Sequence, residues 1–159
     1  MDLILALGIS IGVLAGIWGE VSAATGLVTW IGFLSWGSFY AIGGGTHGLI
    51  KTLPSNLSGV FWGAMIFYAS SALNVPFILG ISICIASIIM CVQSKWSVLS
   101  FIPGTFAGCA SYFGSDFDFT GTCIALVAGA LLGYISEVGG VYLSKIGIKQ
   151  KEVNTENSM

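Results

Sequence analysis

Residues 3–22 read LILALGISIGVLAGIWGEVS, and this stretch decides the fold class. Its one charged residue is Glu20, which lies near its end. A helix needs about 20 mainly apolar residues to cross the hydrocarbon core of a bilayer, so these residues are predicted to form a membrane helix. No positively charged segment precedes them and more apolar sequence follows, so the helix is expected to be retained rather than cleaved as a signal peptide.

Five further stretches have a similar composition and approach the same length. They lie near residues 27–43, 56–74, 76–93, 97–114 and 121–144. The connections are short, and the longest, residues 43–55, carries glycines and a proline. The sequence therefore predicts an all-α integral membrane protein in which residues 1–147 form one domain of six transmembrane helices. Residues 148–159 are polar and are predicted to form a cytoplasmic tail.

The composition excludes several classes of protein. Only 8% of the 159 residues are charged and the mean hydropathy is +0.94, whereas a soluble domain carries about 25% charged residues. All five basic residues are lysines, too few for a surface that binds nucleic acid. The four cysteines lie in apolar stretches without a CxxC pair, and no pairing of a nucleophile with a base stands out. Neither an enzyme nor a bound metal or cofactor is therefore expected.

The lysines indicate the orientation of the chain in the membrane. If six helices alternate in direction, the N-terminus, the second and fourth connections and the tail share one side. Lys51 lies in the second connection, Lys95 in the fourth, and the remaining lysines begin the tail, while Asp116 and Asp118 fall on the opposite side. Lysine is enriched in cytoplasmic segments, so both termini are predicted to be cytoplasmic.

Short sequence matches recur in the same order in the two halves of the chain. Residues 7–11 and 79–83 both read LGISI, residues 34–39 (LSWGSF) parallel residues 99–106 (LSFIPGTF), and residues 58–59 (SG) parallel residues 120–121 (TG). These matches predict two repeats of three helices, at residues 1–74 and 76–146. Three helices reverse the direction of the chain, so the second repeat must be inverted, as in many transporters.

Three segments carry a resemblance to a known family. Residues 12–19 (GVLAGIWG), 30–33 (WIGF) and above all 101–106 (FIPGTF) resemble the YcdZ-like bacterial inner-membrane proteins. The resemblance covers nearly the whole chain except the polar tail, and it implies a multi-pass protein of the bacterial inner (plasma) membrane. The family has no established substrate, so the resemblance carries over no catalytic or binding residue.

Glu137 is the most informative polar residue, because apolar sequence surrounds it. Burying an ionised carboxylate is costly, so such a residue faces a partner, the interior of the bundle or water. It is therefore a candidate for a transport path or a proton-coupling site. The alternative is a carboxyl group near the cytoplasmic boundary that is satisfied by Ser136, Tyr134 or a lysine.

A Pro-Gly pair falls within the fifth predicted helix. Proline removes one backbone hydrogen bond and glycine weakens the next turn, so a kink or break is expected at Pro103, Gly104 and Thr105. A broken helix exposes backbone groups, which bind solutes in many transporters; a simple structural kink is the alternative. Gly37 and Ser38 are the related positions in the second helix.

Two aromatic residues and one histidine complete the set of candidates. Phe39 and Phe106 could line a narrow pore. His47 is the only histidine, and it could titrate near neutral pH and gate a cytoplasmic mouth, or simply be a solvated loop residue.

The combined pattern favours a channel or facilitator that assembles as a homo-oligomer in the lipid bilayer and conducts a small polar solute. The inverted repeat, the Pro-Gly break and the scarcity of charged residues support this function, and that scarcity disfavours strongly ion-coupled pumping. The competing interpretation is a scaffold or accessory subunit that does not transport and that binds another membrane protein through Gly-rich helix faces.

Overall fold

In the computed structural model the backbone is described for residues 1–156 and the side chains for residues 1–146. This part of the chain forms six α-helices and two short 3-10 helices, without a strand, so the prediction of an all-α protein with six helices is confirmed. The helices are α1 Leu3–Thr25, α2 Thr29–Ala41, α3 Gly45–Ala72, α4 Ile78–Val92, η1 Gln93–Lys95, η2 Ser97–Leu99, α5 Ile102–Gly114 and α6 Phe119–Glu156.

The helices differ in whether they are long enough to cross a bilayer. Among the described residues, three segments are long and apolar enough by length and composition: Leu3–Thr25 in α1, Ile78–Lys95 in α4 and η1, and Phe119–Ile146 in α6. In contrast, α2 and α5 have only 13 residues each. At a rise of about 1.5 Å per residue such a helix extends about 20 Å, less than the hydrocarbon core of about 30 Å.

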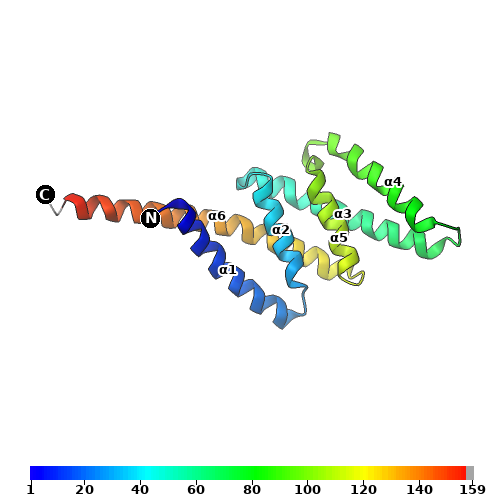
Figure 1. The fold of residues 1–159 in the computed structure, drawn as a ribbon, viewed down its shortest axis with the longest axis horizontal. Helices are drawn as coiled ribbons and strands as arrows, with labels where there is room; N and C mark the ends of the chain where they lie inside the picture. Colours follow the sequence, from blue (N-terminus) through cyan, green and yellow to red (C-terminus); the bar gives the residue numbers. More distant parts are fainter. Residues whose placement is uncertain (157–159) are drawn as a thin grey trace.

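Helices α3 and α6 form the long axis of the molecule and run in opposite directions (Figure 1). The two short helices cross them, α5 packing mainly on α3 and α2 mainly on α6. Helices α1 and α4 flank the bundle, with α1 beside α6 and α4 beside α3. Each long helix thus carries a short helix and a flanking helix from the other half of the chain.

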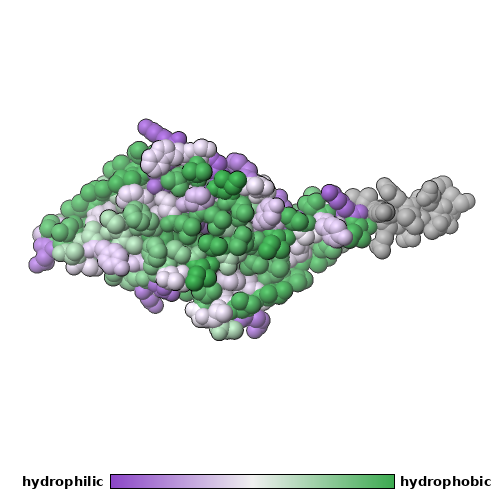
Figure 2. All heavy atoms as spheres, turned by 180° about the vertical axis from the view of Figure 1, so that it is seen from behind, coloured by the Kyte–Doolittle hydropathy of each residue, from purple (hydrophilic) through white to green (hydrophobic). Residues whose placement is uncertain are grey.

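The outer surface is apolar, and a hydrophobic cluster fills part of the interior. The largest hydrophobic cluster lies where α2, α3, α5 and α6 meet, and its members Ile31, Val60, Tyr112 and Leu126 are buried. Figure 2 shows hydrophobic residues over most of the face in view, and α1 and α4 expose many large apolar side chains. A helix that is apolar all round belongs in a lipid environment, because lipid tails contact its outer face.

The connection predicted at residues 43–55 is wrong. Helix α3 begins at Gly45, so His47 and Lys51 lie within its first turns. Gly43, Gly44 and Gly45 have φ values of +104°, +68° and +63°, and these glycines build a tight turn because they lack the Cβ that disfavours positive φ. The glycines predicted for this connection do form the turn, but the turn is much shorter than residues 43–55.

The fifth helix also begins later than predicted, and Pro103 does not break it. Helix α5 starts at Ile102, after the 3-10 turn at Ser97–Leu99, which places Pro103 in the first helical turn. A proline is tolerated there because the first N–H groups of a helix have no partner within the helix. The predicted kink is therefore wrong.

Helix α6 continues to Glu156. Residues 148–156 of the predicted tail are accordingly helical, and residues 157–159 of that prediction lie outside the described residues. The cytoplasmic placement of this segment stays a prediction.

Candidate functional site

A group of buried polar side chains lies at the centre of the bundle. Its five members are fully buried, with a relative exposure of 0% each, and they come from three helices. They are Ser35 of α2, Thr52, Ser55 and Asn56 of α3, and Thr105 of α5. We call these five residues the polar cluster.

Helix periodicity explains why α3 contributes three members. Residues three or four positions apart lie on the same face of an α-helix. Thr52, Ser55 and Asn56 have this spacing, and Gly59 continues the same face. This face of α3 packs against α5, so the sequence of α3 places its polar groups inside the bundle rather than toward lipid.

Asn56 connects α3 to the neighbouring helices. Its Nδ2 donates a hydrogen bond of 2.9 Å to Oγ of Ser35, and that hydroxyl donates a bond of 2.6 Å to the backbone carbonyl of Leu126 in α6. Asn56 therefore uses its donor side within a chain of bonds from α3 through α2 to α6. Its acceptor, Oδ1, is left on the side of α5.

Four oxygen atoms of the polar cluster lack a hydrogen-bond partner within the part of the chain that the structure describes. They are Oγ1 of Thr52, Oγ of Ser55, Oδ1 of Asn56 and Oγ1 of Thr105. We call them the four unpaired oxygens. A buried polar atom without a partner costs about 1–3 kcal/mol, and lipid cannot supply the missing bond. The four unpaired oxygens therefore reduce the stability of the folded bundle.

Close contact between α3 and α5 surrounds the polar cluster. A Cβ added at Gly59 would overlap the carbonyl oxygen of Thr105, and one added at Gly108 would overlap the carbonyl oxygen of Asn56. A Cβ at Gly104 would lie 3.0 Å from Oδ1 of Asn56. The absence of side chains at these positions brings the two backbones together and leaves no room for a bulky ligand.

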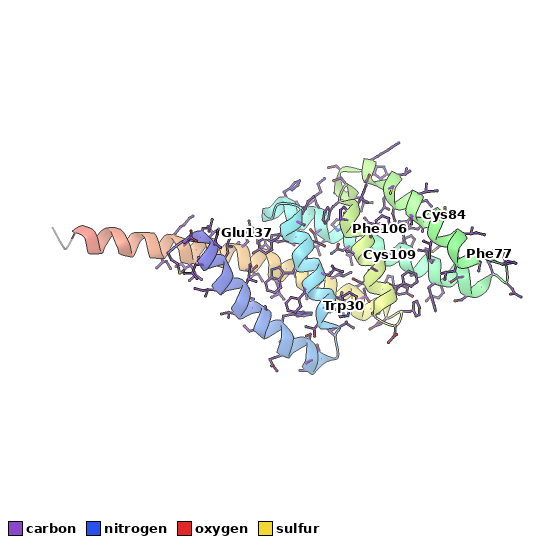
Figure 3. The ribbon with its side chains drawn as sticks, in the orientation of Figure 1. Trp30, Phe77, Cys84, Phe106, Cys109 and Glu137 are labelled. Atoms are coloured by element: carbon purple, nitrogen blue, oxygen red, sulfur yellow. The ribbon has the colours of Figure 1, made fainter. Side chains whose placement is uncertain are left out.

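Glu137 lies away from the polar cluster, at the beginning of α3 (Figure 3). Its Oε2 accepts a hydrogen bond of 2.6 Å from the backbone N–H of Gly45. A Cβ added at Gly44 would lie 2.8 Å from Oε1 of Glu137. The carboxyl group therefore caps the N-terminus of α3, where the helix dipole favours negative charge. The partner of Glu137 is thus a backbone N–H. The alternative of a boundary carboxyl group predicted the side chain of Ser136, Tyr134 or a lysine instead.

A shallow groove of about 380 Å³ borders Glu137. Tyr134, Tyr142 and Lys145 line it together with the first residues of α3 and apolar positions of α6. Its surface is mainly apolar, and it opens on the outside of the bundle rather than toward the polar cluster. It gives Glu137 access to the surroundings but no connection with Asn56.

The remaining predicted site residues are dispersed. Gly37 and Phe106 are exposed. Ser38 and Phe39 are buried, with Phe39 between α6 and the first turn of α3. His47 is exposed. Of all the predicted candidates, the structure brings only Gly104 and Thr105 to the polar cluster.

Sequence reasoning missed four of the five members of the polar cluster. The sequence predicts a connection at Thr52 and Ser55, and this prediction hides their helical spacing with Asn56. Asn56 stands at the first position of the helix predicted at residues 56–74, where its burial is not predicted. The signal that could have found them is the spacing of polar residues at positions 52, 55 and 56 before Gly59 and Gly63, which marks one face of a single helix.

A helical bundle with an apolar outer surface and a polar centre defines a multi-pass membrane protein. The model of a family described as a protein of unknown function (DUF1097) matches residues 8–141. The match covers most of the chain, so the chain belongs to this family.

Relatives of the chain come from two bacteria. The inner membrane protein YcdZ of Escherichia coli K12 is 37% identical over 146 residues, covering 91% of this chain and 90% of that protein. YcdZ of Salmonella typhimurium LT2 is 33% identical over 146 residues, with 91% of each chain covered. YahC of E. coli K12, named as an uncharacterized protein, is 38% identical over 171 residues, covering 94% and 98%. No solved structure matches the chain.

These findings confirm the resemblance noted in the sequence. The chain is a multi-pass protein of the bacterial inner membrane in contact with the lipid bilayer.

Proposed function

We propose that the protein is a channel or facilitator for a small polar solute and that it catalyses no reaction. The polar cluster is the observation that carries this proposal. An unpaired oxygen in a membrane bundle costs free energy that an apolar residue would not, so a purely structural core gains nothing from four of them. A site that replaces part of the hydration shell of a passing solute needs such groups.

The packing of the helices supports an inverted repeat of three helices. Exchanging α1 with α4, α2 with α5 and α3 with α6 converts the α3–α5 contact into α6–α2, and the α3–α4 contact into α6–α1. In Figure 1 each exchanged pair runs in opposite directions. Repeats of this kind are typical of transporters, whose substrate sites lie near the axis that relates the halves.

Glycine contacts support the same exchange at the level of residues. A Cβ at Gly59 of α3 would overlap the carbonyl oxygen of Thr105 in α5, and a Cβ at Gly129 of α6 would overlap that of Gly32 in α2. The two long helices thus each use a glycine to approach the backbone of a short helix. The corresponding positions are Gly59 with Gly129 and Thr105 with Gly32.

Two aromatic residues fit this correspondence one turn further along. The ring of Tyr112 lies 3.1 Å from a Cβ added at Gly63, and the ring of Phe39 lies 2.8 Å from a Cβ added at Gly133. This register aligns residues 38–40 (SFY) with residues 111–113 (SYF). It replaces the alignment of Gly37 with Gly104 that the short sequence matches suggested.

The turns that follow the short helices also correspond. The N–H of Gly44 donates to the carbonyl of Phe39 at 3.1 Å, and the N–H of Phe117 donates to the carbonyl of Tyr112 at 3.2 Å. Gly44 has a φ of +68° and Phe117 a φ of +64°. A positive φ is unusual for phenylalanine, so its presence at the matching position supports a shared backbone plan.

The proposal includes cytoplasmic termini. Nζ of Lys51, in the first turns of α3, donates to the hydroxyl oxygens of Ser97 and Ser100 at 3.1 and 3.0 Å. The beginning of α3 and the link between α4 and α5 therefore lie together, as an alternating arrangement requires. Lys95 adjoins this link, and the enrichment of lysine on the cytoplasmic side supports the orientation.

A second candidate function is a scaffold that binds another membrane helix. Gly8, Gly12, Gly16 and Gly19 of α1 face open space, since a Cβ added at each would meet no atom within 4 Å. Small residues at this spacing allow close approach of helices in lipid. The same stripe suits a second copy of the chain, and the proposed channel is a homo-oligomer for that reason.

Transport by purified protein distinguishes the two functions. The protein is reconstituted in liposomes, and the rate of vesicle swelling is measured in gradients of the neutral probes urea and glycerol. We expect faster swelling than in empty liposomes for at least one probe, and a return to the empty-liposome rate with Asn56→Leu. The control is Ser111→Ala, because the Ser111 hydroxyl is already bonded to the carbonyl of Ala107.

Equal swelling of loaded and empty liposomes for both probes would refute a facilitator of small neutral solutes. Cross-linking at Gly12→Cys then tests the scaffold, which requires a cross-linked product with a different membrane protein.

A further inference from the structure

The four unpaired oxygens lie at only one of two related interfaces. In the proposed repeat the α3–α5 interface corresponds to the α6–α2 interface. The hydroxyl of Ser35 in α2 meets the carbonyl of Leu126 in α6, and Gly108 in α5 meets the carbonyl of Asn56 in α3. Leu126 is thus the counterpart of Asn56, and Gly108 the counterpart of Ser35. Ser55 and Thr105 likewise correspond to the apolar Ala125 and Gly32. Thr52 corresponds to Thr122, whose hydroxyl is bonded to Ser115.

This asymmetry indicates a role other than helix packing. Both interfaces achieve backbone contact through glycine, at Gly59 and at Gly129. The α6 side does so with Leu126 where α3 has Asn56, so close packing does not require the polar side chains. The four unpaired oxygens therefore need an explanation that the repeat itself does not provide.

The chemistry of the four unpaired oxygens limits the class of ligand. They are three hydroxyl oxygens and one amide oxygen, and the donor side of Asn56 is already bonded to Ser35. Oxygen atoms are the preferred ligands of hard cations. The polar cluster contains no Asp or Glu, so it lacks the carboxylates with which proteins hold divalent cations. The set therefore suits a monovalent cation.

The geometry of the interface limits the size of the ligand. The glycine contacts at Gly59 and Gly108 place the backbones of α3 and α5 against one another. Asn56 and Ser55 lie one turn before Gly59, and Thr105 is the residue whose carbonyl meets Gly59. Thr52 lies one turn further from Gly59 on the same face of α3. The four side chains thus belong to one narrow interface between α3 and α5, whose close backbones exclude a bulky ligand.

We propose that the polar cluster binds a single dehydrated Na⁺ between α3 and α5. Thr52, Ser55, Asn56 and Thr105 supply side-chain oxygens as ligands. Bound Na⁺ satisfies the four unpaired oxygens and joins the two interfacing helices. The expectation that scarce charge disfavours ion coupling does not extend to this site, because neutral oxygens hold the ion. The inference rests on the proposed function in that it assigns a ligand to the same cluster.

The test is thermal unfolding of the purified full-length protein in detergent. Sodium chloride replaces choline chloride in steps at constant total chloride, so the ionic strength does not change. A ligand that binds only the folded state raises Tm with concentration. We expect Tm to rise by several degrees with Na⁺ and to rise clearly less with K⁺. A Tm that is the same in Na⁺ and choline, or that rises equally with Na⁺ and K⁺, would overturn the proposal.

Three variants link the response to the polar cluster. Thr105→Val and Ser55→Ala each remove one ligand oxygen with little change in volume, and at least one of them should fold. We expect either variant to need at least tenfold more Na⁺ for the same rise in Tm. Ser111→Ala is the matched control on α5 and should respond like the parent, since its hydroxyl bonds Ala107. An unchanged Na⁺ response in both ligand variants would locate the ion elsewhere and refute the site.

The two experiments distinguish failure of the Na⁺ site from failure of the proposed transport function. If Tm responds to Na⁺ but neither urea nor glycerol crosses liposomes faster, the proposed function is wrong and the Na⁺ site stands. If a probe crosses at the same rate in choline and Tm does not respond to Na⁺, the Na⁺ site is wrong and the proposed function stands.

Discussion

Glu137 of α6 contacts the turn that leads into α3, and Phe67 of α3 contacts the turn that leads into α6. Glu137 accepts the N–H of Gly45 at 2.6 Å. Phe67 stacks on Phe117 with ring centroids 4.1 Å apart. Each long helix therefore holds the start of the other, one through a carboxylate and the other through an aromatic ring. The start of α3 is therefore held by a polar contact, and the start of α6 by an apolar one.

The contact of Glu137 predicts a role in stability. Glu137→Leu removes the acceptor for the N–H of Gly45 and the negative charge at the start of α3. We expect a loss of about 1 kcal/mol or more, the usual value of a helix N-cap or a charge at a helix terminus. Glu137→Gln keeps an acceptor oxygen and should lose less. Thermal unfolding in detergent measures both, and a Glu137→Leu protein as stable as the parent would contradict the capping role.

The glycine contacts predict a pair of equivalent substitutions. Gly59→Ala and Gly129→Ala each place a Cβ against the backbone of a short helix, and we expect each to destabilise the protein by about 1–3 kcal/mol, as overpacking does. The control is Gly80→Ala in α4, where an added Cβ meets no atom within 4 Å. This control should be neutral or slightly stabilising, because alanine is the better helix former. If Gly59→Ala and Gly129→Ala both match Gly80→Ala in Tm, α3–α5 and α6–α2 do not pack as described.

The unpaired oxygens predict that a substitution which removes one of them stabilises the protein and reduces its solute flux. In choline buffer without Na⁺, Thr105→Val removes a buried hydroxyl that has no partner among the described residues. We expect the variant to be more stable than the parent by about 1 kcal/mol, the lower end of the cost of an unpaired buried group. The same variant should reduce solute flux. Denaturation in choline decides the first point, and a variant less stable than the parent would show that the hydroxyl is already satisfied.

The lysines predict which residues a membrane-impermeant maleimide reaches in intact cells. The test uses single cysteines, Lys95→Cys and Asp116→Cys, in a chain whose four native cysteines are replaced by serine or alanine. With cytoplasmic termini, Asp116→Cys should react from outside the inner membrane, while Lys95→Cys should react only after the membrane is opened. The reverse result would place both termini outside the cytoplasm. Labelling of both residues from one side would rule out six alternating crossings.

The sequence predicted the class of the fold because apolar composition constrains the chain strongly in lipid. Residues 3–22 and 121–144 were assigned to helices correctly, since long apolar runs have few alternatives. The start of α3 was missed because Gly43–Gly45, with a proline at 54, reads locally as a loop. Whether three glycines make a tight turn or a loop depends on what caps the next helix, and that residue, Glu137, lies far away in the sequence.

The candidate site was predicted less well for a related reason. The sequence predicts a kink at Gly104 and Thr105; the kink does not exist, although both residues lie at the polar cluster. Asn56 was overlooked because its importance comes from burial against α5 and α2, which a single sequence does not reveal. Phe106 was selected as an aromatic residue for a pore and instead faces outward, because α5 turns its glycines toward α3.

The shortness of α2 and α5 has an electrical consequence. Helices of 13 residues cover about 20 Å of a hydrocarbon layer of about 30 Å. Lipid or water must adapt beside them, so the insulating layer is thinner there and the membrane voltage falls over a shorter distance. For the same voltage, the local field is then about one and a half times that in undisturbed bilayer. At the proposed Na⁺ site, which borders α5, the voltage would then do more electrical work on the ion per ångström, so the acyl-chain length of the surrounding lipid would influence how strongly voltage affects Na⁺ binding.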